Sequence, residues 1–81
     1  MMRIDVLLFA SLKDAIGPTF AVELPDDADV AVLRRTLEGA HPAFARLGSR
    51  TLVAVNECYA RDEDPVRARD VVALLPPVAG G

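Results

Sequence analysis

The C-terminal stretch Val72-Ala73-Leu74-Leu75-Pro76-Pro77-Val78-Ala79-Gly80-Gly81 joins a hydrophobic strand to an ending that no regular element accepts. Proline lacks a backbone N–H donor, so the pair after Leu75 ends any helix or central strand. The two final glycines impose few restrictions on the backbone. The stretch therefore predicts a last strand that ends at Leu75 and an extended, flexible Gly-Gly tail over residues 76–81.

The chain has room for one small domain. At 81 residues, two independent cores would each fall below the size at which a domain usually folds alone. Hydrophobic residues make up 52% of the chain and charged residues 26%, which is typical of a globular domain and argues against intrinsic disorder. We expect residues 1–75 to form the domain and residues 76–81 to leave it as the tail.

The charge balance points to protein partners. The formal net charge is −3, and the acidic residues gather in residues 23–29 and 57–64, which disfavours binding to nucleic acid. Asp5 interrupts the first apolar run, and no stretch is long enough to span a membrane. The single Cys58 offers neither an internal disulfide nor a metal-ligand pair. We expect a cytoplasmic protein without a metal site and without nucleic-acid or membrane partners.

The N-terminal residues alternate with period two. Between residues 3 and 9, one face consists of Ile4, Val6 and Leu8, so the segment is predicted to be a strand with that face buried. The opposite face begins with charged residues and ends at Phe9. We therefore regard Phe9 as a candidate partner contact, with packing under a loop of its own chain as an equal alternative.

Glycine-containing pairs of residues mark the ends of the shorter predicted helical elements. Residues 10–16 are predicted to form a short helical turn that ends at Gly17-Pro18. Residues 19–24 alternate again, which predicts a second strand antiparallel to the first. A further short helical turn is expected over residues 42–47, where Gly48-Ser49 then breaks the pattern.

The one long helix is predicted to begin after Asp29, a suitable N-cap. Its apolar residues recur at helical spacing, whereas Arg34 and Arg35 are expected to point into solvent. The apolar positions are Val30, Leu33, Leu37 and Ala40. Gly39 and Pro42 mark its end. His41 has no acid or nucleophile beside it in the sequence, so a catalytic role is not expected.

Three more strands complete the sheet. They are predicted over residues 51–55, 58–60 and 71–75, with a tight turn at Asn56-Glu57 between the first two. The last strand has apolar residues on both faces, which implies that both faces are covered. A hairpin, a crossing helix and further strands in one short chain define an α+β fold, of which the ubiquitin-like β-grasp is the obvious example. In that fold the last strand lies beside the first.

The familiar catalytic motifs are absent from the sequence. It contains no nucleophile elbow, no phosphate-binding glycine-rich loop and no histidine–cysteine metal spacing. The acidic residues from Asp62 to Asp64 fit a solvated loop better than an acid–base pair. What remains is the main-chain carboxylate of Gly81. ATP would activate it as an acyl adenylate, and a sulfur donor would then convert it into a thiocarboxylate.

Three segments together resemble the MoaD/ThiS family, the small sulfur-carrying subunits of molybdopterin synthase. They are Leu8-Phe9-Ala10, Val53-Ala54-Val55-Asn56 and the Leu-Pro-Pro-Val-x-Gly-Gly ending. The resemblance extends over essentially the whole chain, and the ending is its most specific part. It implies a ubiquitin-like β-grasp fold with five strands, one main helix and a reactive C-terminal glycine.

The resemblance also implies a function. An adenylating enzyme related to ubiquitin-activating enzymes uses ATP on Gly81, a sulfur donor protein supplies the sulfur, and the large subunit directs its transfer to precursor Z. The chain itself would be neither an enzyme nor a holder of a tightly bound cofactor. The residues that the resemblance places at the partner interface are Phe9, Tyr59, Leu75, Pro76, Pro77, Val78, Ala79 and Gly80.

One turn departs from the family pattern. Arg69-Asp70-Val71 stands where Gly-Asp-Glu is common, so we expect a reshaped turn or a positive φ at a cost of about 1 kcal/mol. Two other functions remain open. In the first, the sulfur is delivered instead to thiamine, tRNA thiolation or cysteine synthesis. In the second, the chain is a ubiquitin-like modifier whose tail is joined to lysines or only bound.

Overall fold

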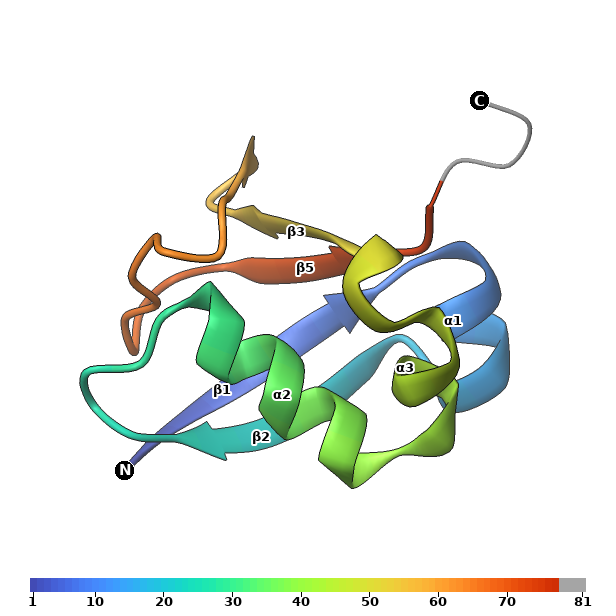
Figure 1. Ribbon diagram of the computed structural model, residues 1–81, viewed down its shortest axis with the longest axis horizontal. Coiled ribbons are helices and arrows are strands. Elements are labelled where there is room, and N and C mark those ends of the chain that lie inside the picture. Colours follow the sequence, from blue (N-terminus) through green and yellow to red (C-terminus); the bar gives the residue numbers. More distant parts are fainter. Residues whose placement is uncertain (78–81) are drawn as a thin grey trace.

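The computed structural model describes residues 1–77 (Figure 1). The α+β class predicted from the sequence is confirmed. In chain order, the elements are β1 (Met2–Leu8), α1 (Ala10–Ile16), β2 (Thr19–Leu24), α2 (Val30–Ala40), α3 (Pro42–Leu47), the 3-10 helix η1 (Gly48–Arg50), β3 (Leu52–Val55), β4 (Cys58–Tyr59) and β5 (Val72–Leu75).

The five strands form one mixed sheet in the order β2-β1-β5-β3-β4. β1 and β2 form the predicted antiparallel hairpin, and β3 pairs antiparallel with both β4 and β5. The first and last strands lie side by side and are parallel, with Val6 opposite Val72 and Leu8 opposite Leu74. The prediction that the last strand lies beside the first is therefore confirmed.

The hydrophobic core lies between the sheet and its helices. Figure 1 shows α2 crossing one face of the sheet, with α1 and α3 at the end where β5 finishes. The strand residues with even numbers in β1, β2 and β5 turn toward α2, as the alternation predicted. The core residues with at most 1% of their surface exposed are Val6, Leu12, Leu24, Val30, Leu33, Leu37, Val53, Val66, Val72 and Leu74.

The N-terminus of α2 has a partner for each of its first three amide groups. The Val30 and Ala31 N–H groups donate to the carbonyl oxygens of Asp64 and Asp62, both at 3.0 Å. The Val32 N–H donates to the Asp29 carboxylate at 3.0 Å, so the predicted N-cap is confirmed. Helix termini leave such groups unsatisfied unless something supplies an acceptor. The acidic loop after β4 is thereby bound to the start of the helix.

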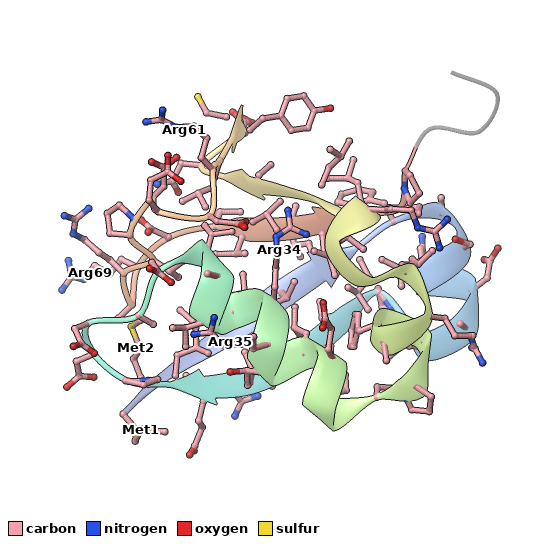
Figure 2. The ribbon with its side chains drawn as sticks, viewed as in Figure 1. Met1, Met2, Arg34, Arg35, Arg61 and Arg69 are labelled. Atoms are coloured by element: carbon pink, nitrogen blue, oxygen red, sulfur yellow. The ribbon has the colours of Figure 1, made fainter. Side chains whose placement is uncertain are left out.

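Arg34 does not point into solvent, and that prediction was wrong. Only 14% of its side chain is exposed. Its Nε donates to the Asp62 carboxylate at 3.0 Å, and a terminal nitrogen donates to the Thr51 hydroxyl at 2.6 Å (Figure 2). Helical spacing alone placed Arg34 outside because the periodicity of α2 does not reveal which loop lies over it. Arg35, one residue further, is exposed as expected.

The end of α2 also differs from the prediction. Gly39 lies inside the helix, which continues to Ala40, and Ala40 is exposed rather than in the core. His41 ends the helix in an extended conformation, with φ −152° and ψ 135°. The cause is Pro42, because a proline disfavours helical geometry at the residue before it. Pro42 was therefore the correct stop signal and Gly39 was not.

The predicted short helix over residues 42–47 and its break at Gly48 are confirmed, because α3 ends at Leu47 and Gly48 is its C-cap with φ 56°. Residues 48–50 then form η1. The turn before β5 has no positive φ at Arg69, so the expected strain is absent. Instead the Asp70 carboxylate accepts from the Arg67 N–H at 2.8 Å, and the Asp70 N–H donates to the Arg67 carbonyl at 3.0 Å. A short polar side chain stabilises this turn without glycine.

The predicted strands run slightly past the observed ones. Phe9 is the N-cap of α1 instead of the last residue of β1, and Thr51, Ala60 and Val71 lie just outside β3, β4 and β5. Among residues 1–77, none of the helices is both long and apolar enough to cross a lipid bilayer.

The burial of Leu33 leads to a stability prediction. Leu33 is fully buried between α2 and the sheet, so Leu33→Ala is expected to lower the free energy of unfolding by about 2–5 kcal/mol. Leu52, with 37% of its surface exposed, is the matched control, and Leu52→Ala is expected to cost less than about 1 kcal/mol. Urea denaturation followed by circular dichroism measures both. Equal losses would contradict the core described above.

Candidate functional site

The face of the sheet opposite the helices presents a continuous row of apolar side chains. Residues directly opposite one another in paired strands share a face of the sheet. Leu7 of β1 is opposite Ala73 of β5, Ala73 is opposite Ala54 of β3, and Ala54 is opposite Tyr59 of β4. These four residues therefore cross four adjacent strands on the open face, between the charged residues that begin β1 and the end where the tail leaves.

A second row lies nearer the tail. Leu52 of β3 is opposite Leu75 of β5. Phe9 continues the alternation of β1 beyond Leu7, because its backbone is extended, with φ −130° and ψ 157°. Phe9 is 46% exposed and Tyr59 72% exposed, which is high for aromatic residues. We call the two rows together the open-face patch: Leu7, Phe9, Leu52, Ala54, Tyr59, Ala73 and Leu75.

The structure places the three patch residues named in advance, Phe9, Tyr59 and Leu75, on the same face of the sheet. Their role in binding stays a prediction. Sequence reasoning had not singled out Leu52 or Ala54. Alternation within each strand was a usable signal for both residues. What the sequence did not supply was the register that aligns β3 with β5.

Tyr59 owes its position to the turn between β3 and β4. Asn56 and Glu57 both have positive φ, 53° and 71°, as the predicted tight hairpin turn requires. The Asn56 side chain accepts from the Val71 N–H at 2.9 Å and donates to Asp70 at 3.0 Å. The Asn56 N–H donates in turn to the Val71 carbonyl at 2.8 Å. The turn, and Tyr59 with it, is therefore held against the segment that enters β5.

The base of the tail adjoins the patch. β5 ends at Leu75, and Pro76 and Pro77 follow, both half-buried. By register this point lies between the end of β1 and the start of β3. By the register of β1 with β5, the tail thus begins beside Phe9. Figure 1 shows η1 and the start of α1 at the same end of the sheet. The predicted site residues Val78, Ala79, Gly80 and Gly81 lie outside the described residues.

The polar side chains considered for catalysis in the sequence, His41 and Asp64 among them, have structural partners. His41 accepts from the Ala43 N–H through Nδ1 at 3.0 Å, which caps α3, and its ring packs edge-on against Phe20 and Phe44. Asp64 accepts from the Arg61 N–H at 2.9 Å. Within residues 1–77, no group of histidine, cysteine, aspartate and glutamate side chains is arranged to hold a metal ion. The open-face patch and the base of the tail are the features that suit binding to another protein.

A mixed five-stranded sheet with a crossing helix, and with parallel first and last strands, places the protein among the ubiquitin-like β-grasp proteins. The chain belongs to the ThiS family, which matches residues 6–81. It is 36% identical over 83 residues to the molybdopterin synthase sulfur carrier subunit of Dictyostelium discoideum, with 98% of this chain and 96% of the relative covered. The family resemblance seen in the sequence is confirmed.

Solved structures agree with this assignment. Small archaeal modifier protein 1 of Haloferax volcanii superposes with a TM-score of 0.82 at 32% identity, covering 96% of this chain and all of the other. A chain from the complex of subunits 1 and 2 of molybdopterin-converting factor from Helicobacter pylori superposes with a TM-score of 0.70 at 26% identity, covering 99% and 100%. The fold is thus similar both to a chain of a molybdopterin-converting factor complex and to a small archaeal modifier protein.

The positive φ of Glu57 predicts a stabilising substitution. In this conformation, the Cβ of a non-glycine residue destabilises the folded state by about 1–2 kcal/mol. Glycine avoids that steric cost, but it loses more conformational entropy on folding, which offsets part of the gain. We expect Glu57→Gly to raise the melting temperature by about 3 °C, corresponding to about 0.5 kcal/mol. Glu63→Gly, in the exposed loop without positive φ, is the control and is expected to lower it. Thermal unfolding by calorimetry decides between these outcomes.

Proposed function

We propose that the chain is the sulfur-carrying subunit of a molybdopterin synthase. The observation that best supports this is the continuity of the open-face patch with the base of the tail. Leu75 belongs to the patch and is the last residue of β5, and Pro76 follows it directly. A partner that covers the patch therefore holds the chain next to its tail. The names of the relatives and the two-subunit complex from Helicobacter pylori support the same partner, the large subunit.

The proposed chemistry takes place on the carboxylate of Gly81. In an adenylating enzyme, a carboxylate oxygen attacks the α-phosphorus of ATP and pyrophosphate leaves. Sulfur at the sulfide level, delivered by a sulfur donor protein, then attacks the acyl carbon, and the bond to AMP breaks. The product is a thiocarboxylate. Glycine suits both steps because it has no Cβ to hinder the carbonyl carbon or to block a narrow channel.

In the last step the large subunit takes in the tail and the thiocarboxylate donates its sulfur to precursor Z. The chain contributes three things: the patch binds, the two prolines direct the tail away from the sheet, and the terminal group reacts. Prolines restrict the unbound tail, so less conformational entropy is lost when the partner encloses it. Catalysis in this scheme belongs to the partners, and the chain is a protein-bound sulfur donor.

The terminal glycine provides the first test. Incubation with the adenylating enzyme of the same organism, ATP and a sulfur donor is expected to add the mass of one oxygen-for-sulfur exchange at Gly81, measured by intact mass spectrometry. Deleting Gly81 or appending one residue is expected to abolish sulfur transfer and to leave the melting temperature nearly unchanged. No mass change in the wild-type chain would refute the proposal, and a large fall in melting temperature would make the tail structural.

The open-face patch provides the second test. Aromatic residues at interface centres often contribute about 2 kcal/mol, so Tyr59→Ala is expected to weaken binding to the large subunit about 30-fold. Arg35→Ala, exposed on α2 on the other side of the sheet, is the control and is expected to leave the affinity unchanged. Titration calorimetry measures both. If Tyr59→Ala binds like the wild type, the patch is not the interface.

A protein modifier is the second candidate, and the similarity to small archaeal modifier protein 1 favours it specifically. In that case the tail would be joined to lysine amines of other proteins. Affinity purification of a tagged chain separates the possibilities. Many covalent conjugates without a thiocarboxylate would support the modifier, whereas rescue of a molybdopterin-deficient strain would support the carrier. Rescue of only a thiamine or tRNA-thiolation defect would keep the sulfur chemistry and change its recipient.

A further inference from the structure

The two ends of the molecule differ in charge. At the end where the tail begins, residues 9–18 and 41–51 contain the basic side chains of Lys13, Arg46 and Arg50 and one acidic side chain, Asp14, which gives a formal charge of +2. The whole chain has a formal charge of −3. At the opposite end, residues 23–29 and 56–71 together have a formal charge of −6. The tail therefore leaves from the positive end of an acidic protein.

The fold brings the three basic residues to the end of the molecule where the tail begins (Figure 1). α1 follows directly where β1 and β5 end together, and Lys13 lies one turn from Phe9. Arg50 is in η1, two residues before Leu52, which is opposite Leu75. Arg46 lines a surface groove of about 210 Å³ between α3 and α1, together with Ser11 and Ala15. We call Lys13, Arg46 and Arg50 the basic neck.

The side chains of the basic neck are exposed, and one of them is held in place. The Arg50 guanidinium donates to the carbonyl oxygens of Leu47 at 3.2 Å and Arg46 at 3.1 Å, the last carbonyls of α3. These bonds fix the position of the guanidinium and leave its charge without a carboxylate partner. A cation held at a helix C-terminus is also favoured by the helix dipole.

Within residues 1–77, Arg67 and Arg69 at the acidic end also lie outside the ion pairs, but acidic side chains outnumber basic ones at that end of the molecule. Among the described residues, the ion pairs join Met1 to Asp26, Arg3 to Asp5, Arg34 to Asp62, and Arg61 to Glu63 and Asp64. None of these pairs, across residues 1–77, involves the basic neck. Figure 2 shows Arg61 and Arg69 at the end of the molecule away from the tail. The positive charge beside the tail is thus available to another molecule.

We propose that the basic neck docks against an acidic rim of the ATP-bound adenylating enzyme, around the opening that takes the tail. This inference rests on the proposed function, which requires the Gly81 carboxylate to meet ATP. Two anions must then approach each other, and the chain as a whole is acidic. The positive charge of the basic neck lowers that repulsion and orients the tail-bearing end of the molecule toward the partner. A nucleic acid is a poorer occupant, because the other end of the chain would repel it.

Steering of this kind acts on encounter more than on the chemical step. It raises the association rate at low ionic strength and fades as salt shortens the Debye length from about 30 Å at 0.01 M to about 8 Å at 0.15 M. The kinetic signature is therefore a change in KM, and in its dependence on salt, with kcat preserved. A residue that only supports the fold would instead change the melting temperature or the fraction of active protein.

The test uses ATP–pyrophosphate exchange by the adenylating enzyme of the same organism, with the full chain as the varied substrate. The double variant Lys13→Glu/Arg46→Glu reverses two charges of the basic neck. It keeps the hydrogen bonds from the Arg50 guanidinium to the backbone carbonyls of Arg46 and Leu47. Its matched control, Arg67→Glu/Arg69→Glu, makes the same charge change on exposed residues at the acidic end. We expect the neck variant to raise KM about tenfold at low salt with kcat within threefold, and the control to raise it less than threefold.

Each result has one meaning. A neck effect that disappears at high salt supports the inference, and Lys13→Gln/Arg46→Gln should then give an intermediate KM. Equal KM values for the wild type and the neck variant, both folded by circular dichroism, would overturn the inference and leave the proposed function intact. Equal effects of the neck variant and its control would also overturn it, because net charge alone would then explain the change. If the wild-type chain supports no exchange at all, the proposed function fails, and the inference fails with it.

Discussion

The parallel pairing of β1 with β5 is the constraint on which the rest of the structure depends. It joins the two ends of the chain at the centre of the sheet, so the intervening residues must cross over one face to connect them. α2 makes that crossing, and its apolar side closes the core against even-numbered residues of both strands. Because parallel strands end at the same edge, the tail begins beside the first turn of α1. The position of the base of the tail is a consequence of sheet topology.

The two faces of the sheet differ in burial. The face under α2 is buried and provides most of the hydrophobic stabilisation available to a domain of this size. The other face holds apolar residues that contribute little to folding while they remain exposed, and contiguous surfaces of this kind often mark binding sites. Leu75 belongs to that surface and also precedes the tail. In the proposed function, a single strand therefore links binding of the partner to delivery of the terminus.

Local signals predicted most of the elements, and their failures share a cause. Asp29 as an N-cap, the Asn56-Glu57 turn and the helical turn over residues 10–16 follow from interactions within a few residues, and all three are present. Arg34 was assigned to solvent because helix periodicity cannot show that a loop 28 residues later covers it. The turn at Arg69 forms without a positive φ because the Arg67 N–H donates a hydrogen bond to Asp70. The comparison with the Gly-Asp-Glu turn of the family did not suggest this bond.

The sequence by itself determined which side of each strand is apolar, where the helix starts, and that the proline pair Pro76-Pro77 ends the last strand. These properties depend on alternation, capping and backbone restriction, which act over a few neighbouring residues. Only the tertiary structure decided which outward residues meet. Leu52 lies opposite Leu75 because β3 pairs with β5, a strand distant in sequence. Tyr59 lies opposite Ala54 because β3 pairs with β4. The same long-range pairings bring Arg50 to the base of the tail, because register is set by the packing of the whole sheet and not by any one segment.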